Sequence, residues 1–268
     1  MKRQMTNMIH KWVPFAILAM WATSGAYTGF AQQAAQPTFP STAEATQNLF
    51  QAVQANNAKT IANILGGPTE LAASGDPAQD KLDREMFVQK YQQMHRVGRE
   101  PDGSMTLYIG AENWPFPFPL VEKNGAWRFD SDAGEKEVLF RRIGENELTV
   151  IDILHQLVAA EKQFRSNPNA TTQVDSPLTS LVAAAARGSQ DGKPLLIQGY
   201  YFRVAAKHPN ADFAFIAYPA EYRSSGVKTF IVTDNDVVNE KDLGAKTRAQ
   251  ASTMPAEYKG GWDAADEK

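Results

Sequence analysis

Residues 212–238 read DFAFIAYPAEYRSSGVKTFIVTDNDVV, and the rest of the chain is organised around them. It contains two runs rich in β-branched and aromatic residues, 213–218 and 227–232, with turn-forming residues between them. This composition favours strands joined by a reversal. The run GYYFRV at 199–204 has the same character. We therefore predict an antiparallel meander of about three or four short strands over residues 199–242.

A long helix is predicted before the meander. Apolar side chains repeat at helical spacing through residues 145–164 and cover about half of the helix circumference. They are Val150, Ile151, Ile153, Leu154, Leu157, Val158 and Phe164. We expect this helix to begin after Gly144 and to cover one face of the meander, which gives an α+β roll. A shorter alanine-rich helix is expected over residues 178–186.

The first half of the chain is predicted to open with three helices. Ser41 and Glu44 have the spacing of a capping box, which marks the start of a helix. Asn57 precedes a second run with helical periodicity. A third, longer helix is expected over residues 77–97, where a proline in the first turn and a glycine after the last residue mark its ends.

Strands are predicted to follow these helices. Residues 105–109 alternate between apolar and polar side chains, as in a sheet with one buried face. Three prolines in 114–119 exclude a central strand there, because proline lacks the amide that a ladder requires. Asn124 and Gly125 lie between two apolar runs and predict a tight β-hairpin. Helices followed by a curved antiparallel sheet indicate a cone-shaped α+β domain over residues 41–143.

The beginning of the chain looks like an export signal. Lys2, Arg3 and Lys11 precede the apolar run 12–22, and small residues follow near 29–31. The apolar run is shorter than the ~20 residues that cross a bilayer, so an uncleaved membrane anchor is the weaker alternative. We expect a periplasmic or secreted protein with no stable membrane anchor after cleavage.

The expected organisation of the whole chain follows from these assignments. It consists of a signal peptide (1–31), a linker (32–40), a cone-like α+β domain (41–143), a second α+β domain (144–259) and a polar tail (260–268).

Composition excludes several classes of protein. The chain has no cysteine, which excludes disulfides, cysteine-ligated zinc and thiol catalysis. Removal of residues 1–31 takes away three basic residues and no acidic one, so the net charge changes from −3 to about −6. This acidic balance argues against nucleic acid or an anionic membrane as a partner.

The sequence predicts no catalytic residues, no metal site and no cofactor. There is no HExxH pair, no phosphate-binding glycine loop and no glycine ahead of Ser224 as in a nucleophile elbow. Asp152 and His155 are spaced like a metal-binding pair, but such pairs are common by chance. The loop with Asp234 and Asp236 lacks the glycine and the spacing of an EF-hand.

Aromatic residues of the first half suggest a candidate pocket. A cone-shaped sheet can leave a cavity lined by such rings, with Trp114 and Trp127 in its wall. The residues proposed to form the pocket and its polar rim are Tyr91, His95, Trp114, Trp127, Arg128 and Asp130. The alternative is that the aromatic rings simply fill the core, where each contributes ~1.5–3 kcal/mol when fully buried.

Four sequence segments resemble those of a known family when they are taken together. They read WPFPFPLVEKNGAWRFD (114–130), IGENEL (143–148), GYYFR (199–203) and YPAEYRSSGVKTFIV (218–232). These segments resemble a family of exported bacterial proteins that is catalogued as domain of unknown function 2950. The resemblance covers nearly all of the chain after the signal, and it implies no activity.

Each half also resembles a broader class of fold. The helical hairpin and the hairpin with Asn-Gly and Trp127 make the first half similar to the nuclear transport factor 2 and cystatin-like superfamily. The helix followed by the 199–242 meander is similar to the globular part of type IV pilin-like and pseudopilin proteins. In pilins a long apolar helix for filament assembly precedes this part, whereas here a cleavable signal and another domain stand in that place.

The function expected from the sequence is that of a non-catalytic binding or assembly module that acts outside the cytoplasm. Its partner is an unknown protein, and the candidate contact surface is the turn with Tyr218, Glu221 and Tyr222. The alternative is a small-molecule-binding protein or a cofactor-independent enzyme that uses the aromatic pocket of the first half.

Overall fold

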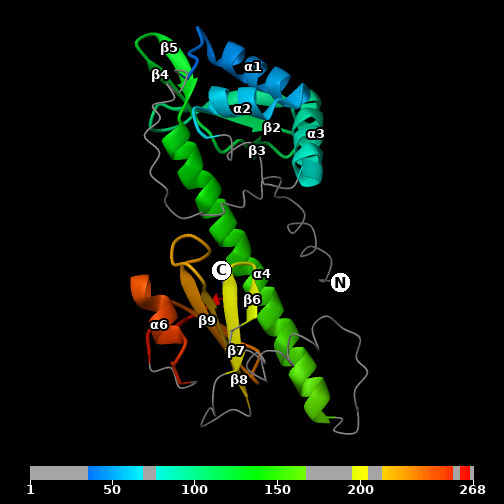
Figure 1. The fold of residues 1–268 in the computed structure, drawn as a ribbon, viewed down its shortest axis with the longest axis vertical. Coiled ribbons are helices and arrows are strands. Elements are labelled where there is room, and N and C mark those ends of the chain that lie inside the picture. Colours follow the sequence, from blue (N-terminus) through cyan, green and yellow to red (C-terminus); the bar gives the residue numbers. More distant parts are fainter. Residues whose placement is uncertain (1–35, 69–76, 167–194, 205–212, 256–259, 266–268) are drawn as a thin grey trace, which may run out of the picture. The chain divides into compact units, whose positions relative to one another are not determined.

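The computed structural model of the protein describes residues 36–68, 77–166, 195–204, 213–255 and 260–265 (Figure 1). The chain divides into two compact units, Met1–Val138 and Leu139–Lys268, and the fold is an α+β fold with antiparallel sheets. The predicted signal peptide and the predicted helix at 178–186 lie outside the described residues. None of the helices in the described part is long and apolar enough to span a membrane.

The first unit opens with α1 (Thr42–Gln54), α2 (Ala58–Leu65) and α3 (Pro77–Gln93). The Ser41 hydroxyl accepts a hydrogen bond from the Glu44 amide at 3.1 Å, and the Asn57 side chain accepts one from the Thr60 amide at 3.0 Å. Both helix starts predicted from the sequence are thereby confirmed, because these side chains satisfy amides that have no partner within the helix.

The third helix is shorter than predicted. It ends at Gln93, and residues expected to be helical form β1 (His95–Arg99), which pairs along its whole length with β2 (Met105–Ile109). The Gly110 amide, which follows β2, donates to the carbonyl groups of Lys90 and Met94. The end of α3 is therefore set by a partner about 16 residues ahead in the chain, beyond the reach of local sequence signals.

In the described part of the first unit, five strands form the sheet. The remaining three are β3 (Trp114–Pro115), β4 (Leu120–Lys123) and β5 (Ala126–Phe129). The order is β1-β2-β4-β5, with β3 paired to β2, and all pairs are antiparallel. Asn124 and Gly125 have positive φ angles of 55° and 78°, so the predicted tight hairpin between β4 and β5 is confirmed.

The long helix α4 (Ser131–Ser166) begins earlier than predicted. The Asp130 carboxylate caps it by accepting a hydrogen bond from the Ala133 amide at 3.1 Å. The helix continues through Gly144, so the expectation that a new helix begins after this glycine is wrong. A glycine inside a helix costs only about 1 kcal/mol relative to alanine, which is too little to interrupt a helix that is capped and packed.

Among the described residues of the second unit, six strands form a sheet in the order β11-β10-β9-β8-β7-β6, and all pairs are antiparallel. They are β6 (Leu195–Ile197), β7 (Tyr200–Val204), β8 (Ala214–Pro219), β9 (Lys228–Thr233), β10 (Val238–Asp242) and β11 (Asp263–Ala264). The predicted meander over 199–242 is confirmed as β7 to β10. The two outer strands lie beyond it, and the sequence reading did not include them.

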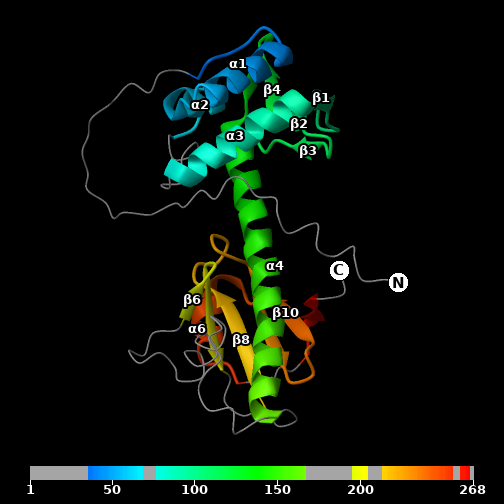
Figure 2. The same cartoon turned by 90° about the vertical axis from the view of Figure 1, so that its right-hand side faces the viewer.

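Both faces of this second sheet are apolar. The helix α4 crosses one face, as predicted (Figure 2). Its buried side chains in the core on that face are Val150, Leu154, Leu157 and Val158. The other face packs against Ala251 of the short helix α6 (Thr247–Ala251), which follows the turn η3 (Gly244–Lys246), and against Met254 and Trp262. Strands β8 and β9 are accordingly buried along almost their whole length, which explains why they were the clearest strands in the sequence.

Candidate functional site

The six residues of the predicted pocket lie in separate places in the first unit. Tyr91 and His95 stack on each other with ring centroids 3.9 Å apart, and His95 Nδ1 lies 2.9 Å from the Tyr91 carbonyl oxygen. Tyr91 is buried and its ring also stacks on Phe50 at 4.6 Å. Trp114 makes an edge contact with Phe116 at 6.4 Å. These three side chains belong to the packing around α3 and β3.

Trp127, Arg128 and Asp130 form a second group at β5. Trp127 exchanges two backbone hydrogen bonds with Phe39, of 2.8 Å and 2.7 Å. The Arg128 guanidinium donates to Gln36 Oε1 at 3.0 Å, while the Gln36 amide nitrogen donates to the carbonyl of Phe129 at 2.8 Å. These contacts attach residues 36–39, which precede α1, to β5. Asp130 follows β5 and caps α4.

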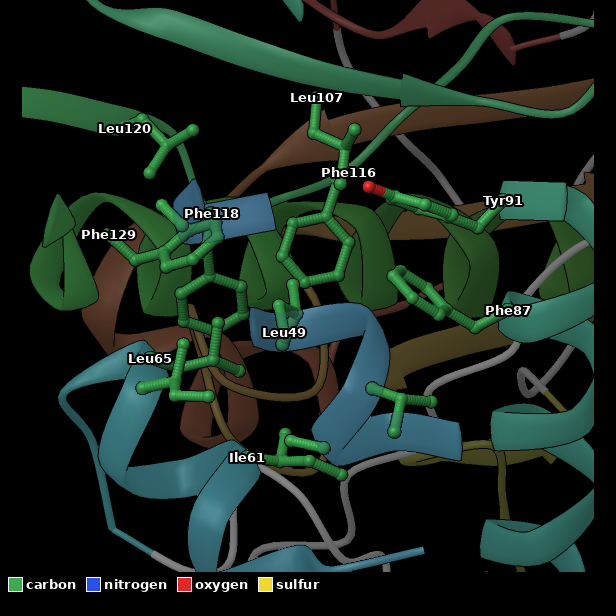
Figure 3. Close-up of a cluster of buried hydrophobic side chains, with 14 of the residues drawn as sticks. Leu49, Ile61, Leu65, Phe87, Tyr91, Leu107, Phe116, Phe118, Leu120 and Phe129 are labelled. Atoms are coloured by element: carbon green, nitrogen blue, oxygen red, sulfur yellow. The ribbon is translucent and has the colours of Figure 1, made fainter. Parts of the chain in front are cut away.

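Aromatic rings occupy the interior of the first unit (Figure 3). Phe116 is central: its ring lies 5.6 Å from Phe87, 5.8 Å from Phe118 and 6.1 Å from Phe129. All four phenylalanines are buried. In Figure 3 the labelled rings point toward one another from α3, from the segment after β3 and from β5, and Leu49, Leu65 and Leu120 fill the remaining space. These contacts are those of a packed core.

The first unit does carry a groove on its surface, which the sequence reading missed. It lies between the end of α1 and α3 and has a volume of about 430 Å³. Val53 and Val88 supply its apolar surface, and amide and charged side chains surround them, namely Gln54, Asn56, Lys81, Arg84, Glu85, Gln89 and Gln92. The Arg84 guanidinium is held by Asn56 Oδ1 and by Asp80. No local pattern marks this site, since it depends on how the two helices pack.

The predicted contact surface lies around the turn between β8 and β9, and its three residues are not equivalent. The Tyr218 side chain is buried at 3% exposure, on the sheet face that packs against α6. Tyr222 is half-buried and its hydroxyl donates to Asp242 Oδ2 at 3.1 Å. Glu221 is exposed, and so is its neighbour Arg223. The exposed part of the turn is thus made by Glu221 and Arg223.

Side chains of α4 hold this turn, which we call the 219–226 loop. The Arg142 guanidinium donates to the carbonyl of Ser224 at 3.2 Å, and the Asn146 amide donates to the carbonyl of Ser225 at 2.8 Å. Two side chains one turn apart on α4 therefore donate hydrogen bonds to two successive carbonyl groups of the loop.

Glu147 holds the point where the loop enters β9. Its Oε1 accepts hydrogen bonds from the amides of Val227 at 2.8 Å and Lys228 at 2.9 Å, and from the hydroxyl of Tyr200 at 3.2 Å. Bonds of amides to a carboxylate are roughly twice as strong as those between neutral groups. Burial, followed by the nearby Glu147 charge, raises the pKa of the Tyr200 phenol, so this hydroxyl stays protonated and acts as a donor.

The loop is also closed within itself. The Ser225 hydroxyl accepts from the Glu221 amide at 3.1 Å and lies 3.2 Å from the Glu221 carbonyl oxygen, to which it donates. Arg223 has a left-handed φ of 61°, and its amide donates to the Gly226 carbonyl at 2.8 Å. A Cβ atom at Gly226 would lie 1.9 Å from the Tyr200 hydroxyl oxygen, so only glycine fits there. The loop is thus fixed from the helix, from the sheet and from within.

One carboxyl group near this anchor has an unusual acidity. Glu145 of α4 is half-buried, and burial raises its pKa to about 7, against the smaller opposing effect of Arg141. Glu145 therefore changes its charge near neutral pH.

The described residues contain no group of three or more histidine, aspartate and glutamate side chains that could hold a metal ion.

Three segments that resembled a known family meet at this anchor. Glu147 comes from the segment 143–148, Tyr200 from 199–203, and Val227 and Lys228 from 218–232, and hydrogen bonds join them directly. The model of the family described as "Protein of unknown function (DUF2950)" matches residues 36–174 and 167–263. No curated protein and no solved structure matches the chain. The chain therefore belongs to the DUF2950 family.

Proposed function

We propose that the protein is an exported, non-catalytic binding or assembly module that recognises a protein partner through the 219–226 loop. The observation that carries this proposal is the anchoring of the loop. Arg142, Asn146 and Glu147 hold its backbone while Glu221 and Arg223 stay exposed. A loop that is already ordered loses little conformational entropy when it binds, so few exposed contacts suffice for useful affinity.

The resemblance of the second half to pilin-like globular domains supports the same proposal. A helix packed on one face of an antiparallel sheet is the arrangement expected of such domains, which serve in assembly. The nuclear transport factor 2 and cystatin-like resemblance of the first half is compatible with it, because folds of this kind also serve as scaffolds.

Site-specific photocrosslinking in the producing cell tests the proposal. A photoreactive side chain is placed at Glu221 or at Arg223, and in a control variant at Lys162, an exposed residue of α4 outside the loop. We expect a protein adduct of one mass at both loop positions and none at Lys162. The additional change Asn146→Ala removes a hydrogen bond to the loop and should weaken the adduct. Absence of an adduct at the loop, or the same adduct at Lys162, would contradict the proposal.

The groove between α1 and α3 favours a second candidate function, which is binding of a small polar molecule. Its volume of about 430 Å³ is within the usual range of ligand sites, although charged side chains surround it. A thermal-shift screen of metabolites tests this function with the wild type and two variants. Gln89→Trp fills the groove, and Gln93→Trp is a control on the same helix outside the groove. A ligand of the groove should stabilise the wild type and the Gln93 variant but not the Gln89 variant. A ligand of an aromatic pocket would instead lose its effect in Trp127→Ala.

A further inference from the structure

The edge of the second sheet at β10 is covered by a very short segment. Residues 260–265 contribute β11, and β11 pairs with β10 at two positions, Ala264 with Asn239 and Asp263 with Glu240. On its other side β10 pairs with β9 at five positions. Because each ladder hydrogen bond contributes only about 1 kcal/mol net, two paired positions hold a strand weakly.

Side chains on both sides of β11 complete its attachment. Trp262 packs against Ile216 and Ile231 on the sheet face that α6 covers, and it is half-buried there. Ala265 packs against the opposite core, the one that α4 covers. The short segment thus places one aromatic and one small side chain on the two faces of the sheet, and it closes the edge between them.

Two glycines bring the segment to the edge. Gly260 and Gly261 both have positive φ angles, of 49° and 73°, which other residues rarely adopt. The Lys241 ammonium donates to the carbonyl of Gly260 at 3.4 Å, and a Cβ atom at Gly261 would lie 3.2 Å from that ammonium nitrogen. The segment that covers the edge therefore has a defined pattern, which is two glycines, a tryptophan and then two extended residues.

We propose that the β10 edge is a strand-acceptor site, and that residues 260–265 of a second copy of this chain can fill it in place of the chain's own. An exposed strand edge is a template for any extended segment that offers matching backbone groups. The segment with the right side chains for both faces is the one already bound there. Reciprocal exchange between two copies uses identical contacts in both and closes into a dimer. This inference is independent of the 219–226 loop and of the proposed function.

Shortening the chain before the segment tests the exchange in the full protein. Deletion of residues 256–259 joins residues 260–265 directly to Pro255, which shortens the connection to their own β10 and does not limit pairing with β10 of a second copy. We expect the deletion variant to be a dimer in size-exclusion chromatography with light scattering. Combining the deletion with Trp262→Ala should return it to a monomer. A monomeric deletion variant, or a dimer that persists without Trp262, would overturn the proposal.

A second measurement does not depend on the deletion. A protease site replaces residues 256–259 in the full chain, and cleavage after folding leaves the segment held only by non-covalent contacts. A labelled peptide of residues 260–268 should then exchange into the cleaved protein. The same peptide with Trp262→Ala should bind about tenfold more weakly, which corresponds to about 1.4 kcal/mol. A peptide with proline at 263 and 264 lacks the ladder amides and should not bind. A cleaved protein that takes up no peptide, or that binds all three equally, would refute the strand-acceptor site.

Discussion

At the scale of single residues, the most informative side chain is Glu147. One carboxylate oxygen receives two backbone amides and the hydroxyl of Tyr200, so one residue determines how the 219–226 loop joins β9. The sequence pattern placed Glu147 on a helix but attached no role to it. Its partners lie 53 to 81 residues away along the chain, and only folding brings them within hydrogen-bond distance.

Removal of this carboxylate should be costly. Glu147→Ala leaves two amides without their acceptor, and we expect it to lower the free energy of unfolding by about 3 kcal/mol. Tyr200→Phe leaves both amide bonds to Glu147 in place. It removes only the hydroxyl, which lies 3.2 Å from Glu147 Oε1 and 3.1 Å from the Lys228 carbonyl oxygen, and should cost about 1 kcal/mol. Urea denaturation followed by circular dichroism compares the two variants. If Glu147→Ala costs no more than Tyr200→Phe, the carboxylate does not anchor the loop.

The raised pKa of Glu145 predicts a dependence of stability on pH. Its pKa is 4.5 in an unfolded chain and about 7 in the folded protein, so between these values the folded state binds more protons than the unfolded state. Stability from this residue is therefore present below pH 4.5 and is lost as the pH rises toward 7. Glu145→Gln should raise the melting temperature at pH 8 and leave it nearly unchanged at pH 4. An equal effect at both pH values would show that the carboxyl is not perturbed.

At the scale of elements, α4 shows how glycines with the same local signal differ in their surroundings. Gly134 lies against Phe118, and a Cβ atom there would be 2.0 Å from the ring, whereas a Cβ atom at Gly144 would meet nothing within 4 Å. The sequence pattern predicts a helix boundary at Gly144, because glycine often ends helices. Packing against Phe118 requires a glycine at position 134, whereas the surroundings of position 144 leave room for a larger residue.

Alanine substitutions at these two positions should have opposite effects. Gly144→Ala removes the conformational freedom of glycine without any clash and should stabilise the protein by about 0.5–1 kcal/mol. Gly134→Ala forces the Phe118 ring to move and should destabilise it by about 1–3 kcal/mol. Thermal unfolding of the two variants gives the comparison. A loss of stability in Gly144→Ala would contradict the continuous helix.

At the scale of the whole molecule, each unit has its own core. Phe116 lies at the centre of the aromatic cluster in Met1–Val138, and Phe230 is fully buried between α4 and the sheet in Leu139–Lys268. Separate cores predict separate unfolding events, since cooperativity follows shared packing.

Core substitutions should therefore act on one unit at a time. Phe116→Ala and Phe230→Ala should each cost about 3–5 kcal/mol in the unit that contains the residue. In differential scanning calorimetry each variant should lower one transition and leave the other in place. A common shift of all transitions by both variants would show that the units unfold as one body.

Features that depend on neighbours in the chain could be predicted from the sequence. The caps at Ser41 and Asn57, the hairpin at Asn124 and the meander over 199–242 follow from side chains that act within a few residues of themselves. The folded structure was needed to show where α3 ends, that α4 passes through Gly144 and that aromatic rings fill the first core. It was also needed to show that Tyr218 is buried whereas Glu221 is exposed. These features depend on contacts between residues far apart in the chain. The energies of such contacts exceed the local conformational preferences from which secondary structure is predicted.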